Sequence, residues 1–131
     1  MKGSYILLMV LPENQIISIG KLGSIFFKKG YYAYIGSAMA KFGSATLENR
    51  VRRHLKPTDR KKKHWHIDYL LEYAKIVKLF LLPMTFKIEC IIANEVSENS
   101  EGVIPGFGSS DCNCRSHLFH FSRYPDFILK Q

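Results

Sequence analysis

The sequence predicts an α+β fold: a small antiparallel or mixed β-sheet packed by about three helices. The first observation is a series of short apolar runs in the first third of the chain, rich in β-branched and aromatic residues and broken by turn residues. The second is a change of pattern after Ser37, where apolar residues begin to recur at helical spacing. A length of 131 residues suits one core, so we expect residues 1–131 to form a single domain.

Four apolar runs in the first third are expected to form an antiparallel meander. The first contains Tyr, Ile, Leu, Met and Val and ends at the turn-forming Pro12-Glu13-Asn14. The fourth reads GYYAYIG, an aromatic composition typical of strands. Strands are predicted at 3–11, 15–19, 24–27 and 30–36, with turns at 12–14, 20–23 and 28–30.

The clearest helix pattern covers residues 47–55. Thr46 can cap its N-terminus. Leu47, Val51 and Leu55 recur every four residues and predict the buried stripe. Further along the chain, the patterns predict helices at 67–74 and 87–96, strands at 76–82 and 118–121, and a Gly-rich loop at 106–110.

Positive charge is concentrated in the window 50–63. The chain has a formal net charge of +8, which favours a polyanionic partner, either nucleic acid or an anionic membrane surface. On the predicted helix, Arg50 and His54 lie on a flank of the apolar stripe, whereas Arg52 and Arg53 are expected to point more toward solvent. The window contains Arg50, Arg52, Arg53, Lys56, Arg60, Lys61, Lys62 and Lys63. It predicts a groove that follows a nucleic-acid backbone, with salt-sensitive and weakly sequence-selective binding.

The cysteine count and the lengths of the apolar runs predict a cytoplasmic protein without membrane contact. An odd number of cysteines, three in a chain of this size, argues against a disulfide framework and for a reducing compartment. No apolar run reaches the roughly 18–20 residues that a membrane span needs. The run 5–11 is similar to a short signal-peptide core, but no small-residue cleavage site follows it, so we interpret it as a buried strand.

Several short motifs occur in the order that a nuclease family uses. Gly3-Ser4-Tyr5 lies on the first predicted strand, Tyr34-Ile35-Gly36 on the fourth, Arg50 on the following helix and Glu89 on a later helix. This order resembles the GIY-YIG endonucleases. The stretches HWHIDYL at 64–70 and GFGSSDCNCRSHL at 106–118 resemble one branch, a prokaryotic GIY-YIG-like domain of unknown function that is fused to a DNA-repair glycosylase in some archaea.

The chain departs from the family pattern in three ways. The two motifs lie further apart than usual, with 28 positions between Tyr5 and Tyr34, which leaves room for an extra hairpin at 15–27. The first motif has Ser4 where the family has Ile. Ser37 follows the second motif where many members have Lys, and the missing cation is expected to weaken phosphate binding or alter substrate choice.

The resemblance implies metal-dependent hydrolysis of nucleic-acid phosphodiester bonds, with DNA preferred over RNA, in a setting of DNA repair. Tyr5 would activate the attacking water as general base or relay, provided that Arg50 or the metal lowers its pKa. Tyr34 would position the water or the phosphate, and Arg50 would bind the scissile phosphate. Glu89 would be the sole protein ligand of Mg²⁺ or Mn²⁺, which would stabilise the leaving 3′ oxygen. The implied products carry a 5′ phosphate and a 3′ hydroxyl.

Other polar residues are candidate contacts to the nucleic acid. His54 belongs to the predicted catalytic set and is expected to touch phosphate. The sequence around Trp65 and Asp68 can cap the second helix, line the cleft or lend a general base. The loop 106–110 can hold a phosphate with its backbone amides or simply form a tight turn. Outside the basic window, the predicted contacts are Ser37, His64, Ser109 and Ser110.

Alternative interpretations stay open from the sequence alone. The tyrosines suit core aromatic positions, and Glu89 suits the first turn of any helix. One alternative function is a nucleic-acid-binding module that has lost turnover and tethers a repair enzyme to DNA. Another is a zinc-stabilised RNA-binding protein. Its ligands would be Cys112, Cys114 and His117, with His64 or Cys90 as a further ligand.

Overall fold

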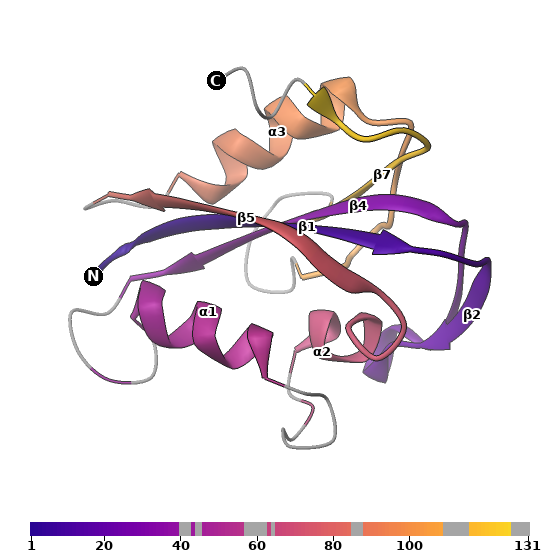
Figure 1. The fold of residues 1–131 in the computed structure, drawn as a ribbon, viewed down its shortest axis with the longest axis horizontal. Helices are drawn as coiled ribbons and strands as arrows, with labels where there is room; N and C mark the ends of the chain where they lie inside the picture. The colour runs from indigo at the N-terminus through magenta and orange to yellow at the C-terminus, as the bar shows by residue number, and fades with distance from the viewer. Residues whose placement is uncertain are drawn as a thin grey trace.

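A computed structural model describes residues 1–39, 43, 46–56, 63, 65–84, 88–108 and 116–126. It has the predicted α+β architecture, with an antiparallel sheet between helices (Figure 1). The elements are β1 (Gly3–Leu11), β2 (Gln15–Ser18), the 3₁₀ turn η1 (Gly20–Leu22), β3 (Ser24–Phe27), β4 (Gly30–Ala38), α1 (Leu47–Leu55), α2 (His66–Leu70), β5 (Lys75–Pro83), α3 (Glu89–Asn99), β6 (Gly102–Val103) and β7 (Leu118–Phe121).

The main sheet has the strand order β5-β1-β4-β7-β6 in the described part of the chain, and all of its pairs are antiparallel. Its inner strand β1 is apolar on both faces, as expected for a strand with helices above and below it. Gly3 lies opposite Ala38 of β4, and the register continues without interruption to Leu11 opposite Gly30. This pairing places the two predicted motifs side by side.

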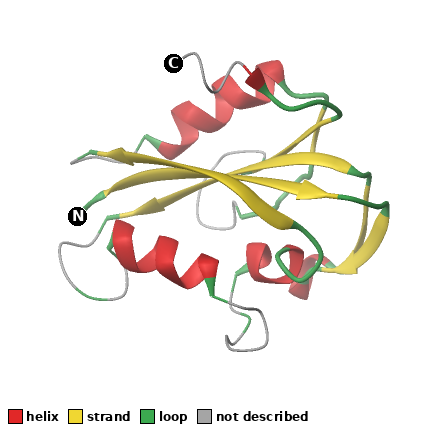
Figure 2. Cartoon of the chain, in the orientation of Figure 1, coloured by secondary structure: helices red, strands yellow, loops and turns green. Residues whose placement is uncertain are grey.

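Two hydrophobic cores lie on the two faces of the sheet, because side chains alternate along each strand. Leu7 faces the helices α1 and α2, together with Tyr5, Leu47 and Ile67. Leu8 faces α3 and packs with other buried apolar side chains, Ile6, Ala33, Ile35, Ala93, Val96, Phe119 and Phe121. Figure 2 shows α1 and α2 below the sheet and α3 above it.

The extra hairpin predicted at 15–27 is confirmed. Strands β2 and β3 pair with each other in a separate two-stranded sheet. Ile17, Ile19 and Phe27 are fully buried and attach the hairpin to the core on the side of α1 and α2. The turn between the strands is η1, and Gly23 follows it with a φ of 79°, a conformation that glycine adopts without strain.

Helix α1 has the predicted bounds, and the Thr46 hydroxyl accepts a hydrogen bond from the Asn49 amide. The prediction that Leu55 completes its buried stripe is wrong, because Leu55 is 57% exposed and His54 is buried instead. The reason is helical geometry. At about 100° per residue, a position seven residues after Leu47 lies closer to the centre of the stripe than one eight residues after it.

The second half of the chain differs from prediction mainly at element ends. Helix α2 ends at Leu70 rather than at 74, and residues 71–73 form a turn. Helix α3 continues to Asn99, beyond the predicted end at 96. The short strand β6 was not predicted, and β7 has its predicted bounds. No helix in the described residues is long and apolar enough to cross a membrane.

Candidate active site

The two motif tyrosines come from neighbouring strands and lie on the same face of the sheet. Tyr5 on β1 lies opposite Gly36 on β4, two residues after Tyr34. The ring centroids of Tyr5 and Tyr34 are 6.4 Å apart. A Cβ atom on Gly36 would collide with the Tyr5 ring, so glycine is required where the Tyr5 side chain crosses β4.

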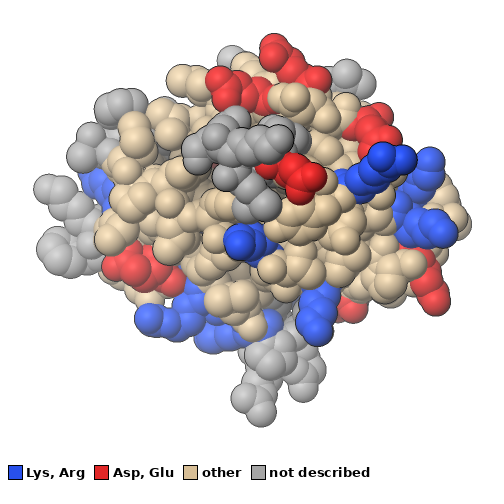
Figure 3. All heavy atoms as spheres, turned by 45° about the horizontal axis from the view of Figure 1, so that its top comes forward, with Lys and Arg blue, Asp and Glu red and all other residues tan. Residues whose placement is uncertain are grey.

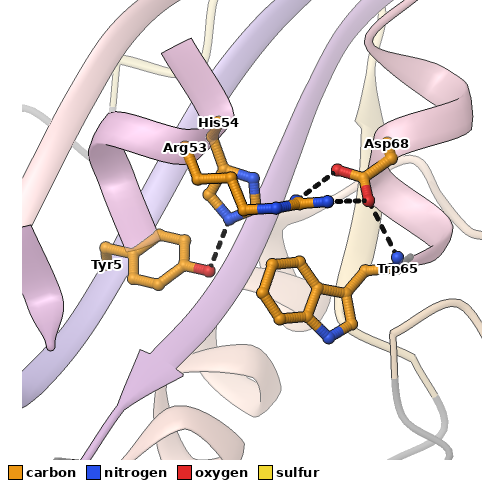
Figure 4. Close-up of polar contacts among 5 residues, drawn as sticks. All are labelled: Tyr5, Arg53, His54, Trp65 and Asp68. Carbon is orange, nitrogen blue, oxygen red and sulfur yellow. Dashed lines mark hydrogen bonds and ion pairs between the residues drawn. The ribbon is translucent and has the colours of Figure 1, made fainter. Parts of the chain in front are cut away.

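His54 joins this pair from helix α1. The Tyr5 hydroxyl and the His54 Nε2 atom are 2.8 Å apart, and both side chains are buried (Figure 4). The His54 ring also lies 6.2 Å from that of Tyr34 and 5.9 Å from that of Trp65, measured between ring centroids. The buried hydrogen bond therefore lies within a group of four rings from four separate parts of the chain, β1, β4, α1 and the start of α2.

Burial raises the pKa of Tyr5 well above its usual value near 10, and Tyr34 adds to this effect. The Arg50 charge opposes the rise, whereas the charges of Glu89 and Asp68 increase it further. The expectation that nearby cations lower the pKa of Tyr5 is therefore wrong for the chain without bound metal. Desolvation outweighs the single guanidinium, so Tyr5 is a neutral phenol at physiological pH.

Arg50 is held beside these rings by two contacts. Its Nη1 atom donates a hydrogen bond to the Ser37 carbonyl oxygen at 3.0 Å, and its guanidinium lies 5.1 Å from the centre of the Trp65 ring. Its Nε atom is buried, and no acceptor for it lies among the residues that the structure describes. Ser37 thus positions the arginine through its backbone carbonyl.

Arg53 does not point toward solvent as predicted. Its Nη1 and Nη2 atoms donate to the two carboxylate oxygens of buried Asp68, at 2.8 and 2.9 Å, and its side chain is only 24% exposed. Its guanidinium also lies 4.4 Å from the centre of the Trp65 ring. Helical periodicity within α1 carries no information about a partner on α2, so this ion pair could not be predicted from the helix alone. Arg52 is exposed as predicted.

Trp65 and Asp68 link the two helices, and this is the role that sequence reasoning left undecided. Asp68 accepts a hydrogen bond from the Trp65 backbone amide at 2.9 Å, which caps α2 at its start. The guanidinium groups of Arg50 and Arg53 both lie against the indole. Figure 4 shows Arg53 beside it. The HWHIDYL motif is the signal that pointed to this segment.

Glu89 lies on α3, the helix that packs on the other face of the sheet. It is the first residue of α3, it is buried, and its charge acts on Tyr5. The described residues contain no group of three or more His, Cys, Asp or Glu that could hold a metal ion. Magnesium binds through one or two carboxylates together with substrate oxygens, and Glu89 fits that donor set.

The start of the Gly-rich loop lies against Tyr34. The Gly108 amide donates to the His66 Nδ1 atom at 2.9 Å, and a Cβ atom on Gly108 would lie 2.9 Å from the Tyr34 ring. Burial lowers the pKa of His66, which favours the neutral ring that accepts this hydrogen bond. Predicted contacts that lie outside the described residues are Arg60, Lys61, Lys62, His64, Ser109 and Ser110.

Two predictions about the remaining polar residues are changed. Lys63 forms an ion pair with Glu72 and lies 5.4 Å from the centre of the Tyr69 ring, whereas Lys56 is exposed. Cys90 is disulfide-bonded, so the expectation of reduced thiols is wrong for this residue. Its Sγ atom lies 3.9 Å from the Nε2 atom of buried His117. The proposed zinc ligands Cys112 and Cys114 lie outside the described residues.

Charge is distributed unevenly over the surface. Figure 3 shows most acidic side chains near the top, where α3 lies, and basic side chains along the bottom and at the right. The acidic side is built from Glu95, Glu98 and Glu101 in and after α3. The basic side includes exposed Arg52 and Lys56 at α1, on the same face of the sheet as Tyr5 and His54.

The comparison with known proteins assigns a family. Residues 4–130 match the family model described as a domain of unknown function, DUF123, so the chain belongs to this family. The match covers nearly the whole chain and includes every residue of the candidate site. No curated protein and no solved structure matches the chain.

Proposed function

We propose that this protein is a divalent-metal-dependent endonuclease of the GIY-YIG superfamily that hydrolyses phosphodiester bonds, in DNA rather than RNA. The observation that carries the proposal is the buried hydrogen bond between Tyr5 and His54 beside Arg50. These residues, together with Tyr34 and Glu89, come from four elements and act on one phenol. A structural core has no need to gather two tyrosines, a histidine, an arginine and a glutamate in one place.

The raised pKa of Tyr5 favours a relay over a phenolate base. In the tautomer that carries its proton on Nδ1, His54 accepts the Tyr5 hydroxyl proton at Nε2. As a water molecule attacks phosphorus, its proton passes to the Tyr5 oxygen and the Tyr5 proton passes to His54. The bond between phosphorus and the 3′ oxygen breaks, and that oxygen takes a proton from solvent. Tyr5 is a neutral phenol before and after the step, so no buried phenolate persists.

Arg50 and Glu89 supply the charges that the reaction requires. Arg50 would bind the scissile phosphate, since its guanidinium is oriented by the Ser37 carbonyl and the Trp65 ring. Glu89 would hold Mg²⁺ or Mn²⁺, which would neutralise charge on the phosphate and at the leaving oxygen. Tyr34 lies where it can orient the water or the phosphate.

A nicking assay tests the proposal. Supercoiled plasmid, single-stranded DNA and structured RNA would be incubated with the protein in Mg²⁺, Mn²⁺ or EDTA. We expect cleavage only with metal. We also expect the cleavage rate to fall by at least about 100-fold in four variants: Tyr5→Phe, His54→Ala, Arg50→Ala and Glu89→Gln. Glu95→Gln on α3 is the matched control, since Glu95 is exposed on the acidic side, and it should cut at the wild-type rate. Cleavage in EDTA, or variants as active as wild type, would contradict the proposal.

A second candidate function is a nucleic-acid-binding module without turnover. The observation that favours it is the burial of both Tyr5 and His54, which leaves little room for water at the hydrogen bond. Salt-sensitive binding to DNA without cleavage on any substrate, unchanged by Glu89→Gln, would support this candidate. A cytoplasmic location and a role in DNA repair are part of both proposals. The odd number of cysteines no longer supports the cytoplasmic location, because Cys90 is disulfide-bonded.

A further inference from the structure

The extra hairpin has one apolar pair on its outer face. Ile16 on β2 and Phe26 on β3 lie directly opposite each other and are 72% and 58% exposed. Along the same face, Ser18 lies opposite Ser24, and both are exposed. An exposed aromatic paired with an exposed β-branched residue forms a compact apolar platform on a strand surface.

The exposed pair Ile16 and Phe26, called the platform below, lies on a hairpin that is anchored to the core. The residues next to Ile16 and Phe26 in sequence, Ile17 and Phe27, point inward and are buried. The Phe27 ring lies 5.9 Å from that of Tyr32 and 6.4 Å from that of Phe107, both in edge-to-face geometry. The exposure of the outer pair is therefore a consequence of strand alternation in an anchored hairpin and does not result from a loose segment.

The charged residues of the hairpin sequence itself are all basic, while exposed Glu13 precedes β2 and Glu101 lies near enough to Lys28 for their charges to interact. Residues 15–30 contain Lys21, Lys28 and Lys29 and no Asp or Glu. In Figure 3, basic side chains gather at the right of the molecule, the side on which Figure 1 places β2. An aromatic surface among lysines complements a nucleobase attached to a phosphate backbone, whereas a purely apolar partner would gain nothing from the lysines.

The hairpin also adjoins the candidate active site. Its inner residues Ile17 and Phe27 belong to the same core as Tyr5 and Tyr34. At its tip, a Cβ atom on Gly20 would lie within van der Waals contact of the Tyr69 ring on α2, the helix that begins beside Trp65. Nucleic acid bound at Arg50 can therefore extend over α2 to the hairpin.

We propose that the outer face of the β2–β3 hairpin binds an unpaired nucleobase, which stacks on Phe26 while Ile16 supports its edge and the lysines contact the adjacent phosphates. This inference rests on the proposed function and names its substrate class: nucleic acid with single-stranded or unstacked bases next to the cut. A base inside an intact duplex has both faces covered and cannot stack on an external ring.

Binding experiments in EDTA test the hairpin separately from catalysis. Fluorescence anisotropy would compare labelled single-stranded DNA, a duplex with a three-base bulge and a blunt duplex. We expect Phe26→Ala to weaken binding to the first two by about 5- to 100-fold and to change blunt-duplex binding little. Phe26→Tyr should keep the affinity, since it retains an aromatic face. Ile91→Ala is the matched control, because Ile91 is 64% exposed on the acidic side at α3.

The outcomes separate the two proposals. If wild-type protein binds no nucleic acid even at low salt, the proposed function fails. If the wild-type protein binds and Phe26→Ala binds each substrate with the wild-type affinity, only the hairpin proposal fails. Anionic vesicles of phosphatidylserine and phosphatidylcholine form a further arm of the experiment, and Phe26-dependent binding to them in place of DNA would overturn the nucleobase assignment. Equal melting temperatures of the variants would establish that they are folded.

Discussion

The two faces of the sheet use the same strands for different purposes. Alternate residues of β1 and β4 face a mostly apolar core on the side of α3, where the buried polar residues include Ser4 and Glu89. On the side of α1 and α2 they face a core with a buried histidine, tyrosines and an ion pair. Buried polar groups stabilise a fold only when each one is paired, whereas apolar side chains need only to fit. The comparison indicates that apolar packing dominates the α3 face, whereas paired polar groups are concentrated on the α1 and α2 face, where the proposed active site lies.

The largest effect is expected from Asp68 on the polar face. Asp68→Ala removes the partner of Arg53 and the acceptor of the Trp65 amide, so we expect a loss of about 3–5 kcal/mol in the free energy of unfolding. Urea denaturation would measure it. Arg52→Ala, the exposed neighbour on α1, should change stability by less than about 0.5 kcal/mol. A small effect of Asp68→Ala would show that the ion pair is not formed in solution.

On the α3 face, a substitution is expected to lower the free energy of unfolding by a comparable amount without changing the cleavage rate. Leu8 is buried against the α3 side, and Leu8→Ala should cost about 2–5 kcal/mol through lost burial and an unfilled cavity. Because Leu8 points away from Tyr5, the cleavage rate per folded molecule should stay at the wild-type level in a nicking assay below the melting temperature. If the cleavage rate of Leu8→Ala falls as far as that of His54→Ala, packing on the α3 face also affects activity, and the two faces do not have separate roles.

The smallest effect concerns the titration of Tyr5. A folded-state pKa above the unfolded value of about 10 means that its contribution to stability is complete below pH 10 and is lost as the pH rises above it. We expect the melting temperature to fall above pH 10, and to fall less in Tyr5→Phe. Tyr31→Phe, on the neighbouring strand, serves as the control. Absorbance of Tyr5 phenolate below pH 10 would contradict this prediction. It would instead support the hypothesis that Tyr5 acts as a general base with a lowered pKa.

Much of the fold could be predicted because its elements have local signals. The strand β1, the hairpin at 15–27 and the helix α1 follow from apolar periodicity, turn residues and the Thr46 cap. The ends of α2 and α3 were less predictable, since neither is marked by proline or glycine at the observed position. Helical geometry places His54 rather than Leu55 toward the sheet, but the hydrogen-bond partner that satisfies the buried His54 ring, Tyr5, lies on β1 and could not be predicted from the helix alone.

The sequence by itself determined the α+β architecture, the order of the motif residues and the positive charge near α1, because these depend on residue type and local spacing. The tertiary structure decided which arginine is exposed, which side chain partners Tyr5 and in which direction the pKa of Tyr5 moves. Those properties depend on distances between β1, α1 and α2 and on the exclusion of water from between them. No local pattern encodes such distances, since each pair of partners is far apart in the chain.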